Sequence, residues 1–245
     1  MAHHRATRAE INLKAFKHNL QNLKTALGSK TDIMAVIKAD AYGHGALPCA
    51  KAAIESGVGY LGAGVIEEGI ELRKNGIRGP VLILGGIFPD EVTDLVHHNL
   101  STILHTSHLA EALSKEGKKQ GKTVNIHIKV DTGMNRLGVL PENLLALTEK
   151  ISSLPNLKIE ALSTHFSSAD DEDLTITNQQ IELFKKTLNK LKKTGIIPPL
   201  THLANTSALF RFSESHSKNG KTGTDFIWSS SFSYFKSCGS KFLQN

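Results

Sequence analysis

The chain has 245 residues, of which 40% are hydrophobic, and it carries a formal net charge of +6. These values fit one large α/β domain or two small ones, and no apolar run approaches the ~18 residues that a membrane-spanning helix needs. The lysines are scattered along helical segments without interleaved aromatic residues, so the charge is typical of solvated helix surfaces and argues against nucleic-acid binding.

The first residues, MAHHRATRAE, lack the apolar core of a secretory signal, so we expect a cytoplasmic protein. An amphipathic helix follows, with an apolar face from Ile11 to Leu27. Short apolar or β-branched runs come next, and each has the length of a strand buried on both faces. They cover residues 33–38, 60–64, 80–84, 101–105, 124–130, 159–166 and 201–205.

Segments with helical spacing alternate with these runs, over residues 46–56, 67–75, 90–98, 108–120, 142–152 and 177–193. This alternation predicts parallel strands joined by right-handed crossovers. The seven units come close to the eight of a closed (β/α) barrel, whereas a doubly wound sheet more often has about five or six strands. We therefore predict an α/β fold, a TIM-type (β/α)8 barrel, over residues 1–212.

Residues 213–245 break this rhythm. They are rich in Ser, Lys, Gly and Phe, and they show neither the strand period nor the helix period. We therefore expect an irregular tail and a barrel that lacks its eighth strand, with unpaired, aggregation-prone edges on the first and seventh strands. Cys49 and Cys238 have neither the spacing of a metal site nor the density of a disulfide framework, so two free thiols and no bound metal are expected.

Polar residues fall at the ends of the predicted strands. They are Lys38 and Tyr42 after the first, His105 after the fourth, Lys129, Asp131 and Arg136 around the end of the fifth, His165 after the sixth, and Asn205, Thr206 and Ser207 after the seventh. The C-terminal ends of barrel strands line one shared mouth, where the chemistry of such barrels gathers. We therefore predict one site that contains these side chains.

Lys38 ends the apolar run and has two interpretations. It can extend its charge to the surface past the end of the strand, as most lysines near apolar runs do. Alternatively, burial lowers the pKa of its amine, which can then form a Schiff base with an aldehyde. The run alone favours the first interpretation, and the neighbouring residues favour the second.

The segment AVIKADAYGHG resembles the pyridoxal-phosphate attachment motif of alanine racemases. The likeness continues, in the same order and at similar spacing, through RATRAEINLKAFKHNL, EEGIELRKNGI, ILGGIFPDE, HIKVDTGMNRLG, STHFSSAD and HLANTSAL. A series of motifs over about the first 210 residues is far more specific than a single motif. The resemblance implies the (β/α)8 barrel that forms the N-terminal domain of that family.

The resemblance also implies roles around pyridoxal 5'-phosphate. Lys38 would hold the cofactor as a Schiff base and then act as one of two acid–base groups at the substrate α-carbon. Tyr42 would donate to the cofactor phosphate, although by sequence alone it is a packing aromatic. Asn205, Thr206 and Ser207 would bind the phosphate at a helix start, where Asn or Thr is otherwise only an N-cap. Thr206 stands where the family usually has serine, and the hydroxyl is kept.

Three further residues receive roles from the resemblance. Arg136 would lie beside the phenolic oxygen of the cofactor and the substrate carboxylate, although a loop arginine is most often only solvated. Lys129 is carbamylated in some members and braces that arginine, whereas an unmodified ammonium would repel it. His165 would join a hydrogen-bond chain under the cofactor ring, and its ordinary alternative is a core histidine.

The activity that the resemblance implies is the interconversion of L- and D-alanine, which supplies D-alanine for peptidoglycan. Racemisation needs a second acid–base group on the opposite face of the α-carbon, and the family takes it from the C-terminal β domain of the partner in a homodimer. This sequence ends before such a domain, and Tyr234 matches no family motif. We expect an inactive or impaired racemase, and hypothesise that the reading frame shifted near His216.

Other functions stay open from the sequence. The chain could be a non-catalytic barrel remnant that binds pyridoxal phosphate, or a related barrel enzyme with the same cofactor, such as a racemase of another amino acid or a decarboxylase. The extended match favours alanine.

Overall fold

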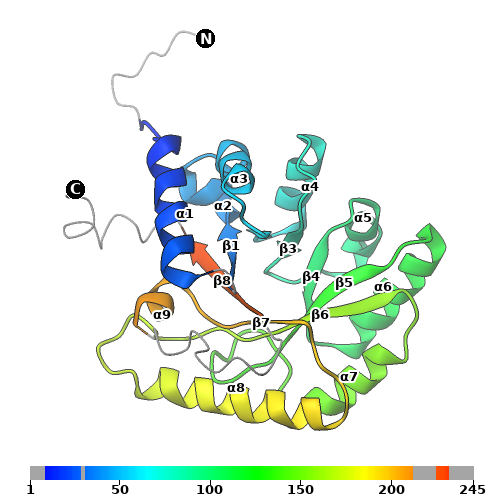
Figure 1. Ribbon diagram of the computed structural model, residues 1–245. Coiled ribbons are helices and arrows are strands. Elements are labelled where there is room, and N and C mark those ends of the chain that lie inside the picture. Colours follow the sequence, from blue (N-terminus) through cyan, green and yellow to red (C-terminus); the bar gives the residue numbers. More distant parts are fainter. Residues whose placement is uncertain (1–8, 29–30, 212–224, 232–245) are drawn as a thin grey trace.

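The computed structural model describes residues 9–28, 31–211 and 225–231. Eight parallel strands form a closed barrel in chain order, each paired with the next and β8 paired with β1 (Figure 1). The strands are β1 (Asp32–Val36), β2 (Tyr60–Ala63), β3 (Val81–Ile83), β4 (Ser101–Leu104), β5 (Val124–Lys129), β6 (Leu157–Ser163), β7 (Leu200–His202) and β8 (Asp225–Ser231).

The helices lie outside the strands (Figure 1). They are α1 (Leu13–Leu27), α2 (Lys38–Gly43), α3 (Ala46–Glu55), α4 (Ile66–Lys74), the 3-10 turn η1 (Pro89–Glu91), α5 (Val92–His97), α6 (Ser107–Gln120), α7 (Leu144–Ser152), α8 (Thr175–Lys193) and α9 (Thr206–Arg211). None of the helices in the described ranges has the length and apolar character needed to cross a membrane.

Local sequence explains where α1 begins. The Asn12 side chain accepts hydrogen bonds from the N–H groups of Lys14 and Ala15, both at 3.0 Å, and so caps the helix. Leu20 and Leu23 on its apolar face are buried, and α1 packs against α3. Ile11, which the apolar pattern assigned to the helix, precedes the cap and is 40% exposed.

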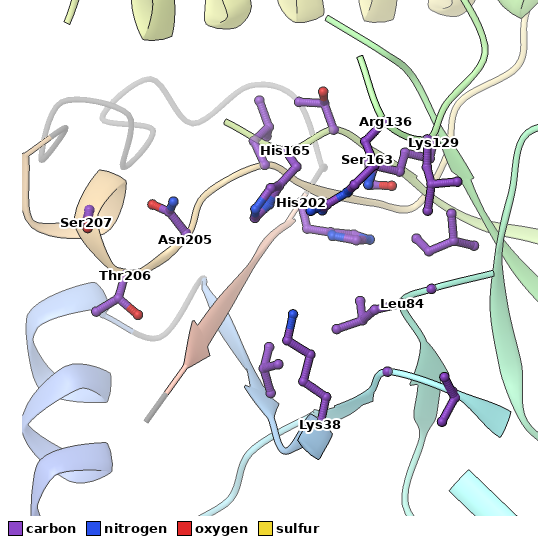
Figure 2. Close-up of a pocket in the computed structure, with 18 of the residues that line it drawn as sticks. Lys38, Leu84, Lys129, Arg136, Ser163, His165, His202, Asn205, Thr206 and Ser207 are labelled. Atoms are coloured by element: carbon purple, nitrogen blue, oxygen red, sulfur yellow. The ribbon is translucent and has the colours of Figure 1, made fainter. Parts of the chain in front are cut away.

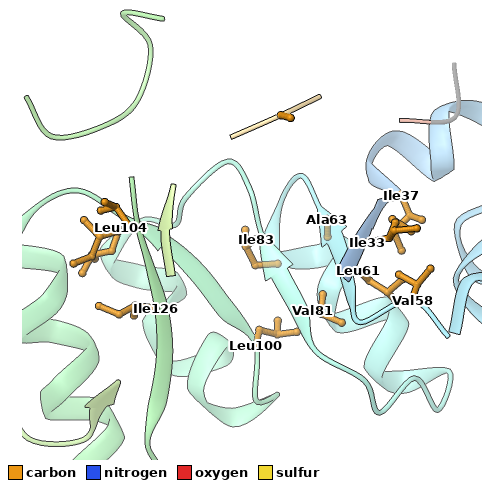
Figure 3. Packing of buried hydrophobic residues seen from close by; sticks show 14 of the residues in the cluster. Ile33, Ile37, Val58, Leu61, Ala63, Val81, Ile83, Leu100, Leu104 and Ile126 are labelled. Atoms are coloured by element: carbon orange, nitrogen blue, oxygen red, sulfur yellow. The ribbon is translucent and has the colours of Figure 1, made fainter. Parts of the chain in front are cut away.

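Two apolar clusters form the core. The larger one joins strand side chains to the surrounding helices, and Figure 3 shows part of it, with Leu61 from β2, Ile83 from β3 and Ile126 from β5. The smaller one is built from Met34, Leu82 and Ile103 on β1, β3 and β4, with no exposed surface or almost none. Because each fully buried aliphatic side chain contributes roughly 1.5–3 kcal/mol, these clusters hold the scaffold that positions the strand ends.

The fold prediction is confirmed for the barrel, for the seven predicted strands and for the helices between them. The prediction that the eighth strand is missing is wrong. Residues Asp225–Ser231 pair with β1 over five positions and with β7 over two, so neither neighbour has an open edge there. The apolar part of DFIWSSS is too short to show a strand period. The segment is a strand because it pairs with neighbours on both sides, and local sequence does not reveal such pairing.

Cys49 is a buried free thiol, as expected, and burial, followed by the charge of Asp40, raises its pKa. The expected domain boundary at residue 212, the frame shift near His216, Tyr234 and Cys238 all lie outside the described residues.

Candidate active site

A cavity of about 530 Å³ opens at the C-terminal ends of the strands. Its lining includes eight of the ten side chains that the sequence placed in one site, and His105 and Asp131 are not among them. The eight are Lys38, Tyr42, Lys129, Arg136, His165, Asn205, Thr206 and Ser207. Figure 2 shows Lys38 extending from one side of this space and the rings of His165 and His202 from the other. The predicted convergence on one mouth is therefore observed for these eight side chains.

Lys38 is exposed, so the expectation that it is buried is wrong. The dry part of the run ends one residue earlier, because β1 stops at Val36 and Ile37 is the last buried residue before the lysine. The ammonium extends into the open mouth, and its Nζ lies 5.8 Å from the centroid of the Tyr42 ring. The amine is thus directed at the cavity with an aromatic neighbour, but Lys38 lacks the burial that the second interpretation assumed.

The turn that carries Lys38 is left-handed. Residues 39–42 all have φ between 50° and 55°, and none of them is glycine. Such backbone costs L-residues roughly 1–2 kcal/mol each and persists only where the surroundings enforce it. Within the turn, Ala41 N–H donates to the Ile37 carbonyl at 2.8 Å, and the Asp40 carboxylate accepts from Ala46 N–H at 2.6 Å.

We expect Ala39→Gly to raise the free energy of unfolding by about 0.5–1 kcal/mol, because glycine adopts positive φ without a Cβ penalty. The greater conformational entropy of glycine in the unfolded chain offsets part of this stabilisation. Urea unfolding measures the change. Ala15→Gly, in the exposed face of α1, is the control and should lose about 1 kcal/mol. Loss of stability in both variants would contradict the left-handed turn.

Glu68, on α4, fastens this turn to the neighbouring strand. Its Oε1 accepts from Ala39 N–H at 2.6 Å, and its Oε2 accepts from Gly64 N–H at 2.6 Å and from Val65 N–H at 3.4 Å. One carboxylate therefore satisfies three backbone donors and holds the residue after Lys38 against the end of β2. Sequence analysis missed Glu68, because a carboxylate in the first turn of a helix ordinarily indicates only capping.

Replacing Glu68 by leucine is expected to lower the free energy of unfolding by about 2 kcal/mol, since the three N–H groups lose a charged acceptor. Chemical denaturation checks this. Glu67→Leu, an exposed neighbour on the same helix, should change stability by less than about 0.5 kcal/mol. Equal effects of the two substitutions would contradict the proposed role of Glu68.

Lys129 and Arg136 form the cationic side of the cavity. Lys129 is only 7% exposed, and burial, then the charges of Arg136 and Lys38, lower its pKa to about 8 against the opposing effect of Asp131. Arg136 is exposed in a loop that Asp131 shapes, because its Oδ1 accepts from the N–H groups of Gly133 and Asn135 at 2.9 and 3.0 Å. Asp131, to which the sequence gave no role, therefore positions the arginine loop.

The imidazoles around Lys129 are neutral at neutral pH. Burial, then the charges of Lys129, Arg136 and Lys38, lower the pKa of His165 to about 4. Burial and neighbouring groups also lower the pKa values of His202 and His105. The cavity therefore carries its positive charge on lysine and arginine alone among these side chains, which suits an anionic ligand.

Gln180, on α8, ties two active-site loops together. Its Nε2 donates to the His165 carbonyl at 3.0 Å and to Thr132 Oγ1 at 3.4 Å, while its Oε1 accepts from Ser167 N–H at 3.0 Å. Gln180 is 1% exposed. It was not found in the sequence, where it is one polar residue in an amphipathic helix.

The segment after β7 combines a helix cap with one buried hydroxyl group that has no partner among the described residues. Asn205 Oδ1 accepts from Ala208 N–H at 3.0 Å, so the N-cap interpretation of Asn205 is correct. Thr206 Oγ1 is buried and has no hydrogen-bond partner in the described part of the chain. A buried hydroxyl without a partner costs free energy, so its position in the cavity wall fits a polar ligand group.

Comparisons with known proteins identify the family of the chain. A family model described as "Alanine racemase, N-terminal domain" matches residues 11–226. The alanine racemase of Halothermothrix orenii is 40% identical over 85% of this chain and 55% of its own length, and that of Carboxydothermus hydrogenoformans is 42% identical over 85% and 56%. The chain therefore spans about half the length of these curated relatives.

Solved structures give the same result. An alanine racemase of Clostridium difficile 630 superposes with a TM-score of 0.86 and 30% identity, over 93% of this chain and 61% of the other. A histidine racemase of Leuconostoc mesenteroides has a TM-score of 0.81 and 28% identity, over 93% and 59%. The fold and the position of the cavity define a (β/α)8 barrel of the kind found in these solved racemases. More specifically, the chain belongs to the alanine racemase N-terminal domain family.

Proposed function

We propose that this chain is the cofactor-binding barrel of a pyridoxal-phosphate-dependent racemase that interconverts L- and D-alanine. The observation that carries the proposal is the position of Lys38, Arg136 and the unpartnered Thr206 hydroxyl in the wall of one cavity. When bound, pyridoxal phosphate would supply an aldehyde and an electron sink. The residues present fit such a ligand, since it combines an anion with a group that an amine can attack.

The chain's own residues would divide the work. Lys38 would hold the cofactor and move a proton at the α-carbon of the substrate from one face. Thr206, Ser207 and Tyr42 would donate to the phosphate, and Arg136 would bind the substrate carboxylate with its forked donors. Neutral His165 would flank the ligand without adding charge. By resemblance, the second acid–base group would come from a partner subunit in a homodimer.

We also propose Lys129 as a site of carbamylation. With a pKa of about 8, a substantial fraction of its amine is unprotonated at mildly alkaline pH and can react with carbon dioxide. The product would be an anion beside Arg136 in place of a repelling cation. Carbon-13 NMR in labelled bicarbonate should give a carbamate signal that Lys129→Met abolishes; a signal that persists in the variant would exclude this site.

The experiment that tests the proposed function has two measurements. Pyridoxal phosphate added to the chain should produce visible absorbance near ~420 nm, a general property of the cofactor bound to an amine. A coupled assay should then follow exchange between L- and D-alanine. Absence of the absorbance would contradict cofactor binding, whereas absorbance without turnover would support a non-catalytic cofactor-binding barrel.

A racemase of another amino acid is the second candidate, because a histidine racemase is among the similar solved structures. The same assay with L-histidine separates the two. If L- and D-histidine interconvert faster than L- and D-alanine, histidine is the preferred substrate. A cytoplasmic location is part of the proposal for either substrate, whereas the supply of D-alanine for peptidoglycan is proposed for alanine alone.

A further inference from the structure

A chain of hydrogen bonds crosses the barrel interior on the side of β5, β6 and β7. His127 Nδ1 lies 2.9 Å from His202 Nε2, and His127 Nε2 lies 3.1 Å from Glu160 Oε2. Both imidazoles are buried. Asn125 Nδ2 donates to Glu160 Oε1 at 3.1 Å, and Tyr60 also hydrogen-bonds the carboxylate. The path therefore runs from a carboxylate to His202, which lines the active-site cavity.

A β-bulge places Glu160 on this path. Ile126 pairs with Ile159, but His127 pairs with Ala161, so Glu160 is an extra residue with no partner on β5. A bulge re-aims the side chain that it inserts. Without the bulge, strand alternation would give Glu160 a position opposite a residue of β5, and its side-chain direction would change.

The direction of each hydrogen bond follows from the carboxylate. Burial raises the pKa of Glu160, but the hydrogen bonds from His127 and Tyr60 and the positive charge of Lys158 outweigh this and lower it, so Glu160 is ionised. An ionised carboxylate only accepts, so His127 carries a proton on Nε2. When this is the single proton on the His127 ring, Nδ1 is an acceptor and His202 donates to it from Nε2.

We propose that Glu160 acts through His127 as a positioning residue that holds His202 with its proton on Nε2, so that the ring offers an unprotonated Nδ1 as an acceptor for an N–H or O–H donor of the ligand. This Nδ1 has no hydrogen-bond partner among the described residues. The inference deepens the proposed function and rests on it only for the identity of the ligand. A doubly protonated His127 would reverse the relay and make Nδ1 a donor.

Nitrogen-15 NMR of the histidine rings, on the chain without cofactor at pH 7.5, tests the proposal independently of any activity. His202→Asn and His127→Asn identify the resonances by difference. We expect His202 in the wild-type chain to have a protonated Nε2 and an unprotonated Nδ1. Glu160→Leu should shift its ring toward a mixture of tautomers, because His127 is then free to reverse.

Tyr60→Phe is the matched control, since it removes a different bond to Glu160 and keeps the relay. It should leave the His202 signals unchanged. A proton on Nδ1 of His202 in the wild-type chain overturns the proposal even if Glu160→Leu fails to fold. Unchanged His202 signals in a folded Glu160→Leu variant overturn it as well, because they would show that Glu160 does not set the tautomer.

Discussion

Lys38→Met is expected to abolish covalent trapping of pyridoxal phosphate in the cavity. In the wild-type chain, borohydride reduction should attach the cofactor to Lys38, and peptide mapping would locate it. The reason is proximity. A phosphate bound by the Thr206 side of the cavity would hold the aldehyde near the Lys38 amine and raise its effective concentration far above that at a surface lysine.

Lys51→Met provides the control for this experiment. Lys51 is exposed on α3 and does not line the cavity, so its loss should leave the labelling of Lys38 intact. Labelling spread over many lysines in the wild-type chain, and unchanged by Lys38→Met, would mean that the cavity does not direct the aldehyde. The assignment of Lys38 would then be withdrawn.

Lys129→Met is expected to stabilise the chain at neutral pH by up to about 3 kcal/mol. The pKa of Lys129 in the folded chain, about 8, is below its ordinary value of 10.5, so the folded state resists the protonated form. This difference in pKa corresponds to a destabilisation of the folded state by roughly 3 kcal/mol. This penalty is complete below pH 8, where the amine is protonated in both states, and methionine removes it.

The stabilising effect of Lys129→Met depends on pH. Between pH 8 and 10.5 the unfolded chain binds the extra proton, so the stability of the wild-type chain should rise with pH, and the advantage of Lys129→Met should shrink. Urea unfolding at pH 7 and pH 10 measures both. Lys186→Met, on the exposed face of α8, should show no such pH-dependent difference. A constant advantage across this range would contradict the lowered pKa.

The parts of the fold with periodic sequence could be predicted. Apolar runs such as those at 80–84 and 101–105 have the length of buried strands, and their alternation with helical segments indicates a parallel barrel. The strand at Asp225–Ser231 could not be predicted, because its conformation depends on pairing with β1 and β7. The left-handed turn of α2 opposes the local preferences of Ala39 and Tyr42, so no propensity argument would give it.

The residues that line the cavity could be predicted from the sequence, but most of the residues that position them could not. Strand ends and motifs identified the cavity residues, whereas Glu68 and Gln180 act through contacts between segments far apart in the sequence. His127 left one signal that was not used: the alternation in VNIHIKV places Asn125, His127 and Lys129 on one face of β5. A polar face on a strand that otherwise reads as core indicates a hydrogen-bonded interior.

One side of the barrel interior is apolar and the other contains a hydrogen-bonded polar network. The two sides therefore differ in how many substitutions they tolerate. Met34, Leu82 and Ile103 make non-directional van der Waals contacts. Exchanges among aliphatic residues of similar volume therefore preserve the packing. On the other side, Glu160, His127 and His202 depend on one another for a partner. In related sequences we therefore expect single substitutions at the apolar positions. At Glu160, His127 and His202 we expect substitutions to occur together.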